Sequence, residues 1–466
     1  MSFIRDLKTA PPVGRTVALT AAALGITYGY DISNIAGALI FLKRDFGLSG
    51  ALEGFMAIIV VVGQIVGALL GGWLANAIGR KKAMVVVAAG YVIFAAFSGL
   101  APNTELLLLI RVLLGVTIGL AITVVPVFIA ESAPSNIRGG LLTSYQVTTV
   151  IGIVLGDVVC WALLPTASWR LMLGVAAIPA VVVLFALTRV NETPNWLLMN
   201  GRDEEAIKIL RRTERPEDVD TELASIKRSL AEDKGGSTFA RLREMFSGYL
   251  LRATLFAIGL GFFIQITGIN ATIYYAPKIF EQMGFQSNSQ QLLLAALVQL
   301  ASLFSVIISM MIIDQFGRRR VLLSGISVML AAEILLVIVY TAGGGFSGIF
   351  EWIGLFGLIV FTMGYTFGFG AIVWVFAGEI FPTQYRALGA SVVLTADLVA
   401  NLIVGELFPV LLPMVGGAGM FAIFAVLTAA AMLFVFRLAP ETKGRSLDEI
   451  QEYWKNGARW KSTRVS

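Results

Sequence analysis

Long runs of apolar residues dominate this chain, and each is about as long as a helix must be to cross a membrane. A spanning helix takes about 20 predominantly apolar residues, because the hydrocarbon core of a bilayer is about 30 Å thick. Six such runs precede a polar stretch at residues 191–248, and six follow it. With 57% hydrophobic and only 14% charged residues among 466, the chain carries more apolar side chain than a soluble protein could bury. The sequence therefore predicts an all-α membrane protein with twelve transmembrane helices.

The positions of the runs suggest four parts. We expect spans at residues 16–42, 54–78, 83–100, 106–128, 141–164, 171–187, 250–273, 292–313, 321–342, 350–376, 388–412 and 420–438. The parts are an N-terminal six-helix bundle (1–190), an intracellular helical linker (191–248), a C-terminal six-helix bundle (249–438) and a cytoplasmic tail (439–466).

The linker is charged but patterned. Residues 202–213 and 219–230 place apolar side chains at helical spacing, which predicts two short amphipathic helices with Pro216 between them. They form either a solvated lid and linker or part of a gate.

Composition excludes several classes of function. The chain has no histidine, which removes Ser-His and Cys-His catalysis and most zinc chemistry. Its one cysteine, Cys160, lies in an apolar run and allows no intrachain disulfide. We therefore expect no enzyme, no cofactor and no metal. The formal charge of +5 comes from basic residues between the apolar runs, so topology explains it better than a nucleic-acid partner does.

The basic residues also predict orientation. If the spans alternate in direction, the clusters of lysine and arginine fall on one side of the membrane, with Lys43-Arg44 and Lys278 as exceptions. Lysine and arginine gather on the cytoplasmic side of membrane proteins. We therefore expect a multi-pass protein of the cell membrane with both termini in the cytoplasm, and we expect no removable signal peptide. The clusters are Arg80–Lys82, Arg138, the linker, Arg318–Arg320, Arg386 and the tail.

Short motifs repeat at equivalent places in the two halves. GGWLANAIGRKKAM (71–84) follows the second run and SMMIIDQFGRRRVLL (309–323) follows the eighth. ESAPSNIRGGLL (131–142) follows the fourth run and GEIFPTQYRALGA (378–390) follows the tenth. Two related halves around a central path are typical of secondary transporters, with the binding site near the middle of the membrane.

Acids and bases at these turns suggest a gate. We expect them to form ion-pair clusters that hold the inner side closed and break when it opens. In the alternative, the basic residues serve topology alone. The predicted intracellular gating network is Arg80, Glu131, Arg138, Arg318, Glu379 and Arg386.

Two charged residues lie deep within apolar runs. At about 1.5 Å per residue, Asp31 lies roughly 22 Å from the cytoplasmic side and Arg111 roughly 10 Å below the outer surface. These depths agree within the error of the span boundaries, so we expect the two to pair. Separating them would raise the affinity of Asp31 for a proton, which gives a physical route to proton coupling. The alternative is a static ion pair that ties two helices.

Further polar residues within the runs are candidates for contacting a solute. Amides and an indole N–H supply the donors and acceptors that a polyhydroxylated solute needs, and tryptophan adds an apolar face. The alternative for each amide is hydrogen bonding between helices. We interpret Glu333 as structural. The candidates are Gln146, Asp157, Gln265, Asn270, Trp374, Asp397, Asn401 and Glu406.

The motifs together resemble the sugar porter family of the major facilitator superfamily over nearly the whole length. The pieces are GYDISNIAGAL, GGWLANAIGRKK, LIRVLLGVTIGL, ESAPSNIRG, ITGINATIYYAPKIF, DQFGRRR, GEIFPTQYRALG and PETKGRS. The resemblance implies two pseudo-symmetric six-helix bundles and a small intracellular helical domain. It also implies that Asp31 is the proton-coupling acid and Arg111 its partner. Gln146, Gln265, Asn270 and Trp374 fall on sugar-binding positions.

The chain departs from the family pattern at several of these positions. Ile264 replaces a glutamine, Ser302 an asparagine, and Asp397 and Leu398 replace an amide and a tryptophan. Asp397 would favour a polyol, an amino sugar or a cationic solute, or would itself titrate.

The function predicted is proton-coupled symport of a monosaccharide or sugar-like polyol by a monomer in the lipid bilayer. The alternative on the same fold is a passive facilitator or exporter in which Asp31 is only structural. A membrane-embedded receptor or enzyme is a third reading, but no catalytic constellation supports it.

Overall fold

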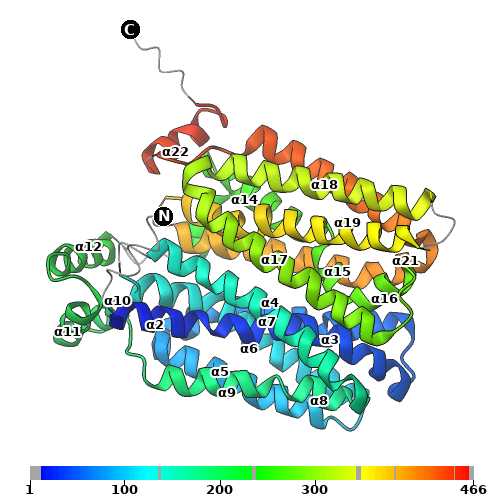
Figure 1. Cartoon of the computed structure of the whole chain (residues 1–466). Coiled ribbons are helices and arrows are strands. Elements are labelled where there is room, and N and C mark those ends of the chain that lie inside the picture. The colour runs from blue at the N-terminus through cyan, green and yellow to red at the C-terminus, as the bar shows by residue number, and fades with distance from the viewer. Residues whose placement is uncertain are drawn as a thin grey trace. The chain divides into compact units, whose positions relative to one another are not determined.

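The computed structural model describes residues 12–134, 138–232, 238–342, 348–382, 385–445 and 447–460, and within these ranges it is helical, without a strand (Figure 1). Ten helical segments in this part are long and apolar enough to cross a membrane. One of them, α21 (Arg386–Leu438), breaks at Gly416 (φ 67°) and so supplies two spans. The helices α2 (Pro12–Ala22) and α3 (Leu24–Phe46) supply the remaining span. The predicted fold of twelve transmembrane helices is confirmed.

The spans follow the apolar runs closely. After α2 and α3, the first half contains α4 (Gly50–Ile78), α5 (Arg80–Leu100), α6 (Thr104–Ser132), α7 (Arg138–Leu163), the short η1 (Leu164–Thr166), α8 (Trp169–Gly174) and α9 (Ala177–Thr188). Before α21, the second half contains α14 (Leu250–Ile266), α15 (Ile269–Tyr274), α16 (Ala276–Gln282), α17 (Asn288–Phe316), α18 (Arg318–Ala342), α19 (Ile349–Tyr365), the π-helical η2 (Thr366–Gly370) and α20 (Ala371–Glu379).

Internal contacts divide the chain into two compact units. Unit 1 is Met1–Lys234 with Asn288–Leu300, and unit 2 is Gly235–Ser287 with Ala301–Ser466. The four-part division drawn from the sequence stays a prediction.

Equivalent spans pair in the same way inside each unit. In unit 1, α3 packs on α7, and α5 packs on α6 and α9. In unit 2, α14 packs on α21, and α18 packs on α19 and α21. The second and fourth spans, α4 and α6, are in contact, and their counterparts are joined by a hydrogen bond from Ser305 on α17 to the Met363 carbonyl on α19. The repeat seen in the turns therefore extends to the packing of the helices.

Glycines allow close contact between α4 and α6. A Cβ atom at Gly63 would collide with the Val112 carbonyl oxygen, and one at Gly115 would collide with the Val60 carbonyl oxygen. Small residues at such crossings let spanning helices approach backbone to backbone, which is a main source of packing energy in lipid.

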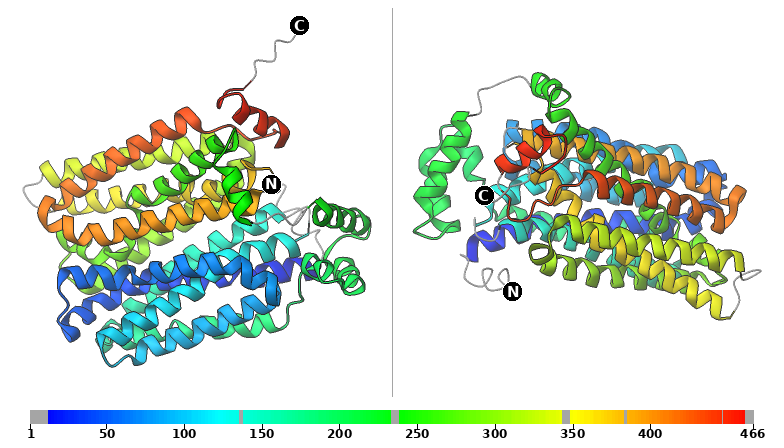
Figure 2. Two further views of the ribbon diagram at one scale, coloured as in Figure 1. Left: turned by 180° about the vertical axis from the view of Figure 1, so that it is seen from behind. Right: turned by 90° about the horizontal axis from the view of Figure 1, so that it is seen from above.

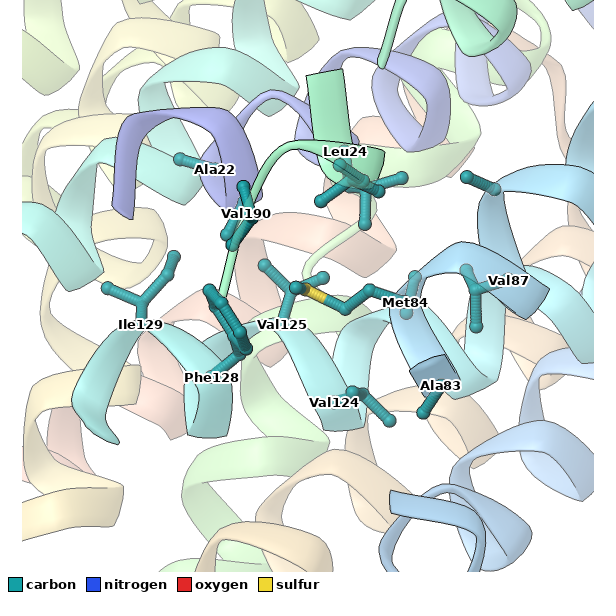
Figure 3. Packing of buried hydrophobic residues seen from close by; sticks show 14 of the residues in the cluster. Ala22, Leu24, Ala83, Met84, Val87, Val124, Val125, Phe128, Ile129 and Val190 are labelled. Carbon is teal, nitrogen blue, oxygen red and sulfur yellow. The ribbon is translucent and has the colours of Figure 1, made fainter. Parts of the chain in front are cut away.

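The core of unit 1 near this crossing is apolar and dense. Met84 on α5 meets Val125 and Phe128 on α6, and all three are fully buried (Figure 3). By contrast, Leu69 and Trp73 on α4 are 69% and 70% exposed, as expected for side chains that face lipid.

The linker is more helical than the sequence predicts. The two expected amphipathic helices are α11 (Asp203–Thr213) and α12 (Val219–Glu232), and they are accompanied by α10 (Pro194–Met199) and α13 (Thr238–Met245). The helices α10 to α12 share a small core and lie at one end of the unit 1 helices (Figure 2). In unit 2, Trp454 of the tail helix α22 (Leu447–Lys455) is buried against Phe256 of α14.

Candidate functional site

The structure brings Asp31 and Arg111 together in unit 1. Arg111 Nη1 on α6 lies 3.5 Å from Asp31 Oδ1 on α3, and the two side chains are 1% and 4% exposed. Among the described residues, neither of these atoms has a hydrogen-bond partner. Charge-assisted hydrogen bonds measure about 2.7–2.9 Å, so the two groups attract each other without being locked together.

Two tyrosines lie near this pair: Tyr91, and Tyr30, which precedes Asp31 in the chain. Tyr91 on α5 is fully buried and close enough to Asp31 and Arg111 to interact with both electrostatically. Its hydroxyl donates to the Thr27 carbonyl on α3 at 2.6 Å, and the Tyr30 hydroxyl donates to the Met172 carbonyl on α8 at 3.4 Å. Neither hydroxyl donates to the acid.

The predicted substrate residues divide between the units. Gln146 is half-buried on α7 of unit 1. In unit 2, Gln265, Asn270 and Asp397 are buried, whereas Trp374 on α20 is 36% exposed.

The seventh span is interrupted between two of these residues. Gln265 lies near the end of α14, Gly268 adopts a φ of 96°, and Asn270 is the second residue of the short helix α15. Interrupted spans are typical of transporter binding sites. The Gln265 side chain lies close to the Asp397 carboxylate, and Asn401 Nδ2 donates to the Tyr274 hydroxyl at 3.3 Å.

Part of the predicted gating network in unit 1 is assembled in the structure. Arg80 Nε lies 3.1 Å from Glu131 Oε2, and Arg80 Nη2 donates to Glu131 Oε1 at 3.2 Å. Thr193 donates its hydroxyl to Glu131, and Glu192 accepts a hydrogen bond from the Lys81 amide at 3.0 Å. The Arg138 side chain lies outside the described part of the chain.

The same arrangement recurs in unit 2. Arg318 Nη2 lies 3.2 Å from Glu379 Oε1, Thr442 donates to Glu379, and Glu441 accepts from the Arg318 amide at 2.9 Å. Arg386 is half-buried within electrostatic range of Glu379, and its Nε has no hydrogen-bond partner in the described structure.

Tyr385, next to Arg386, links this turn to α13. Its hydroxyl donates to Glu244, and this hydrogen bond raises the pKa of Tyr385 to about 12.

Glycines before the two arginines are required by geometry. Gly79 and Gly317 have φ of 100° and 92°, values that favour glycine, and a Cβ atom on either would run into Glu192 or Glu441 respectively. Sequence reasoning missed the roles of Glu192 and Thr193. The sequence contains a signal for these roles, because a Glu-Thr pair follows both the sixth and the twelfth apolar run.

Two more buried acids lie within the spans. The Glu333 carboxylate on α18 accepts from the Thr428 hydroxyl at 2.9 Å and is fully buried, which fits its structural interpretation. Asp157 on α7 is also buried, and its Oδ2 has no hydrogen-bond partner among the residues the structure describes.

Comparison with known proteins decides the family. Residues 17–454 match the family model described as "Sugar (and other) transporter". The chain belongs to the sugar porter family of the major facilitator superfamily. As a sugar porter it is a multi-pass membrane transporter and not an enzyme.

Several transport proteins are similar over nearly their full length. A putative metabolite transport protein of Bacillus subtilis, YwtG, is 35% identical over 92% of both chains. The arabinose-proton symporter of Escherichia coli K12 is 32% identical over 96% of this chain and 94% of its own.

Solved structures show the same fold. The proton:xylose symporter XylE bound to 6-bromo-6-deoxy-D-glucose matches with a TM-score of 0.81 at 28% identity, covering 95% of this sugar porter and 99% of that chain. The inward-open form of XylE from E. coli matches with a TM-score of 0.80 at 26% identity over 95% and 100% of the two chains.

Proposed function

We propose that this sugar porter carries out proton-coupled symport of a monosaccharide or sugar-like polyol. The observation that supports this most directly is the buried Asp31–Arg111 pair, whose facing atoms are close but make no hydrogen bond to any described residue. The names of the similar arabinose-proton, galactose-proton and proton:xylose symporters are consistent with it.

The physical basis is the cost of charge in a membrane. An ionised side chain at the centre of a bilayer costs about 3 kcal/mol or more, so an unpaired Asp31 or Arg111 would be unfavourable there. Protonation of Asp31 neutralises the carboxylate and removes its attraction for Arg111. The contact between α3 and α6 is then weaker, and the loaded carrier can reorient. Release of the proton on the inner side restores the pair.

The solute is proposed to be bound by the polar residues predicted from the sequence. Gln146, Gln265 and Asn270 supply donors and acceptors for hydroxyl groups. Trp374 supplies an indole face for the apolar side of a sugar ring, and Asp397 adds an acceptor.

The two ion-pair clusters are proposed to act as the inner gate. Arg80 with Glu131, and Arg318 with Glu379, stabilise the state that is closed to the cytoplasm and separate when it opens. Arg138 and Arg386 are proposed to join them. We propose that the turns, and with them both termini, lie on the cytoplasmic side of the cell membrane, and that the working form is a monomer.

Gradient-driven uptake tests the proposal. Purified protein is reconstituted in proteoliposomes, and radiolabelled xylose, arabinose, galactose and glucose are offered with and without an imposed inward proton gradient. Symport predicts transient accumulation above the external concentration, and a protonophore abolishes it. Uptake that only equilibrates, whatever the gradient, would instead identify a passive facilitator.

A further inference from the structure

A second buried acid in unit 2 lacks the basic partner that Asp31 has. Asp397 on α21 is 5% exposed, and its carboxylate lies close to the Gln265 side chain on α14. No lysine or arginine of the described residues forms an ion pair with it. Burying a carboxylate without a counter-charge is unfavourable, so the site is incomplete as it stands.

Three oxygen atoms at this site also lack a hydrogen-bond donor. Asp397 Oδ1, Gln265 Oε1 and Asn401 Oδ1 are each buried without a hydrogen-bond partner in the described part of the chain. Asn401 follows Asp397 by four residues and therefore lies on the same face of α21. Its Nδ2 already donates to the Tyr274 hydroxyl, so Asn401 Oδ1 is the atom that lacks a partner in the described part of the chain. Three acceptors therefore lie together, and one of them belongs to an acid.

Other groups near the acid do not supply the missing charge. Among the described residues, the titratable group within electrostatic range of Asp397 is Tyr365 on α19, which also interacts with Tyr274. A proton on Asp397 would remove its charge but would leave the oxygens of Gln265 and Asn401 without donors. Glu333, the other buried acid of this unit, differs because Thr428 donates to it.

An ammonium group fits these requirements. It carries one positive charge and three N–H donors and has no acceptor, whereas a sugar hydroxyl has one donor and no charge. We propose that this carrier takes a sugar-like solute bearing a protonated amine, with the amine held by Asp397, Gln265 and Asn401. This inference rests on the proposed transport function and narrows its substrate class.

Binding of three related sugars tests the inference. Purified full-length protein is titrated with D-glucosamine, D-glucose and N-acetyl-D-glucosamine at a pH at which the amine of glucosamine is protonated. Because hydrogen bonds to a charged group are about twice as strong as neutral ones, we expect glucosamine to bind about tenfold or more tightly than either neutral sugar. This comparison uses the unmodified protein and does not depend on any variant folding.

Two variants test whether the charge of Asp397 causes the preference for glucosamine. Asp397→Asn keeps the shape of the side chain and removes its charge, so the preference for glucosamine over glucose should disappear. Glu333→Gln neutralises the other buried acid of the same unit and should retain the preference.

Several results would overturn the inference. These are equal binding of glucosamine and glucose, a preference that survives in Asp397→Asn, or binding of none of the three sugars. Loss of proton-driven accumulation in Asp397→Asn with the amine preference intact would make Asp397 a proton site and would overturn the inference too.

The failure of this inference and the failure of the proposed function can be told apart. Proton-driven uptake of glucose without amine preference contradicts this inference alone. Amine preference without proton-driven uptake contradicts only the proposed coupling.

Discussion

Arg111 Nη1 and Asp31 Oδ1 form a buried ion pair at 3.5 Å in which neither atom makes a hydrogen bond to a described residue. The ion pair between Arg80 and Glu131 in the same unit is different, since it includes a hydrogen bond at 3.2 Å. The pair without a hydrogen bond is suited to a contact that a proton opens and closes.

The close contact of α4 and α6 predicts a sharp difference between two glycines of one helix. Gly63→Ala should lower the stability of the protein by about 1–3 kcal/mol, because the new methyl group collides with the Val112 carbonyl and forces the helices apart. Gly72→Ala is the matched control, since a Cβ atom there meets nothing within 4 Å. Thermal unfolding followed by fluorescence measures both. Equal midpoints for the two variants would contradict the packing described.

The two gating pairs should differ in strength because they differ in burial. The side chains of Arg80 and Glu131 are 7% and 12% exposed, whereas those of Arg318 and Glu379 are 17% and 28% exposed. Glu131→Gln should therefore cost about 3 kcal/mol, because it leaves a buried arginine uncompensated. Glu379→Gln should cost about 1 kcal/mol, since water screens the more exposed pair. Thermal unfolding measures the loss of stability in each variant. Equal losses, or a larger loss in Glu379→Gln, would contradict the prediction.

The structural role of Glu333 also yields a prediction. Thr428→Val removes the hydroxyl that donates to the Glu333 carboxylate and should destabilise the protein by about 1–3 kcal/mol, because a buried acceptor loses its donor. The double variant Glu333→Met with Thr428→Val removes both polar groups and should recover most of this loss. Thermal unfolding of the single and double variants measures the recovery, and a further loss in the double variant would argue against the structural role.

Much of the fold was predictable because the lipid imposes simple requirements. Runs of about 20 apolar residues had to become spans, and the matched Gly-Arg turns revealed the repeat that the helix pairing then showed. The contact of Asp31 with Arg111 followed from their depths alone, because few partners for a charge exist in a bilayer.

Features that depend on tertiary contacts were not predictable in this way. The π-helical turn η2 and the break at Gly268 have no periodic signal, and α10 is too short to show one. Thr193 and Thr442 act through hydroxyls that reach acids distant in sequence, Glu131 and Glu379. The unpartnered oxygens around Asp397 could only be recognised once α14 and α21 were seen side by side.

Transport by the Asp31→Asn variant tests the central claim most directly. In proteoliposomes, the variant should exchange labelled for unlabelled sugar while failing to accumulate it under an imposed proton gradient, because the amide cannot take up the coupling proton. Glu53→Gln, which neutralises another buried acid of unit 1, 3.8 Å from Lys43, is the control and should accumulate sugar normally. Accumulation by Asp31→Asn equal to that of the unmodified protein would show that this acid does not couple the proton to the sugar.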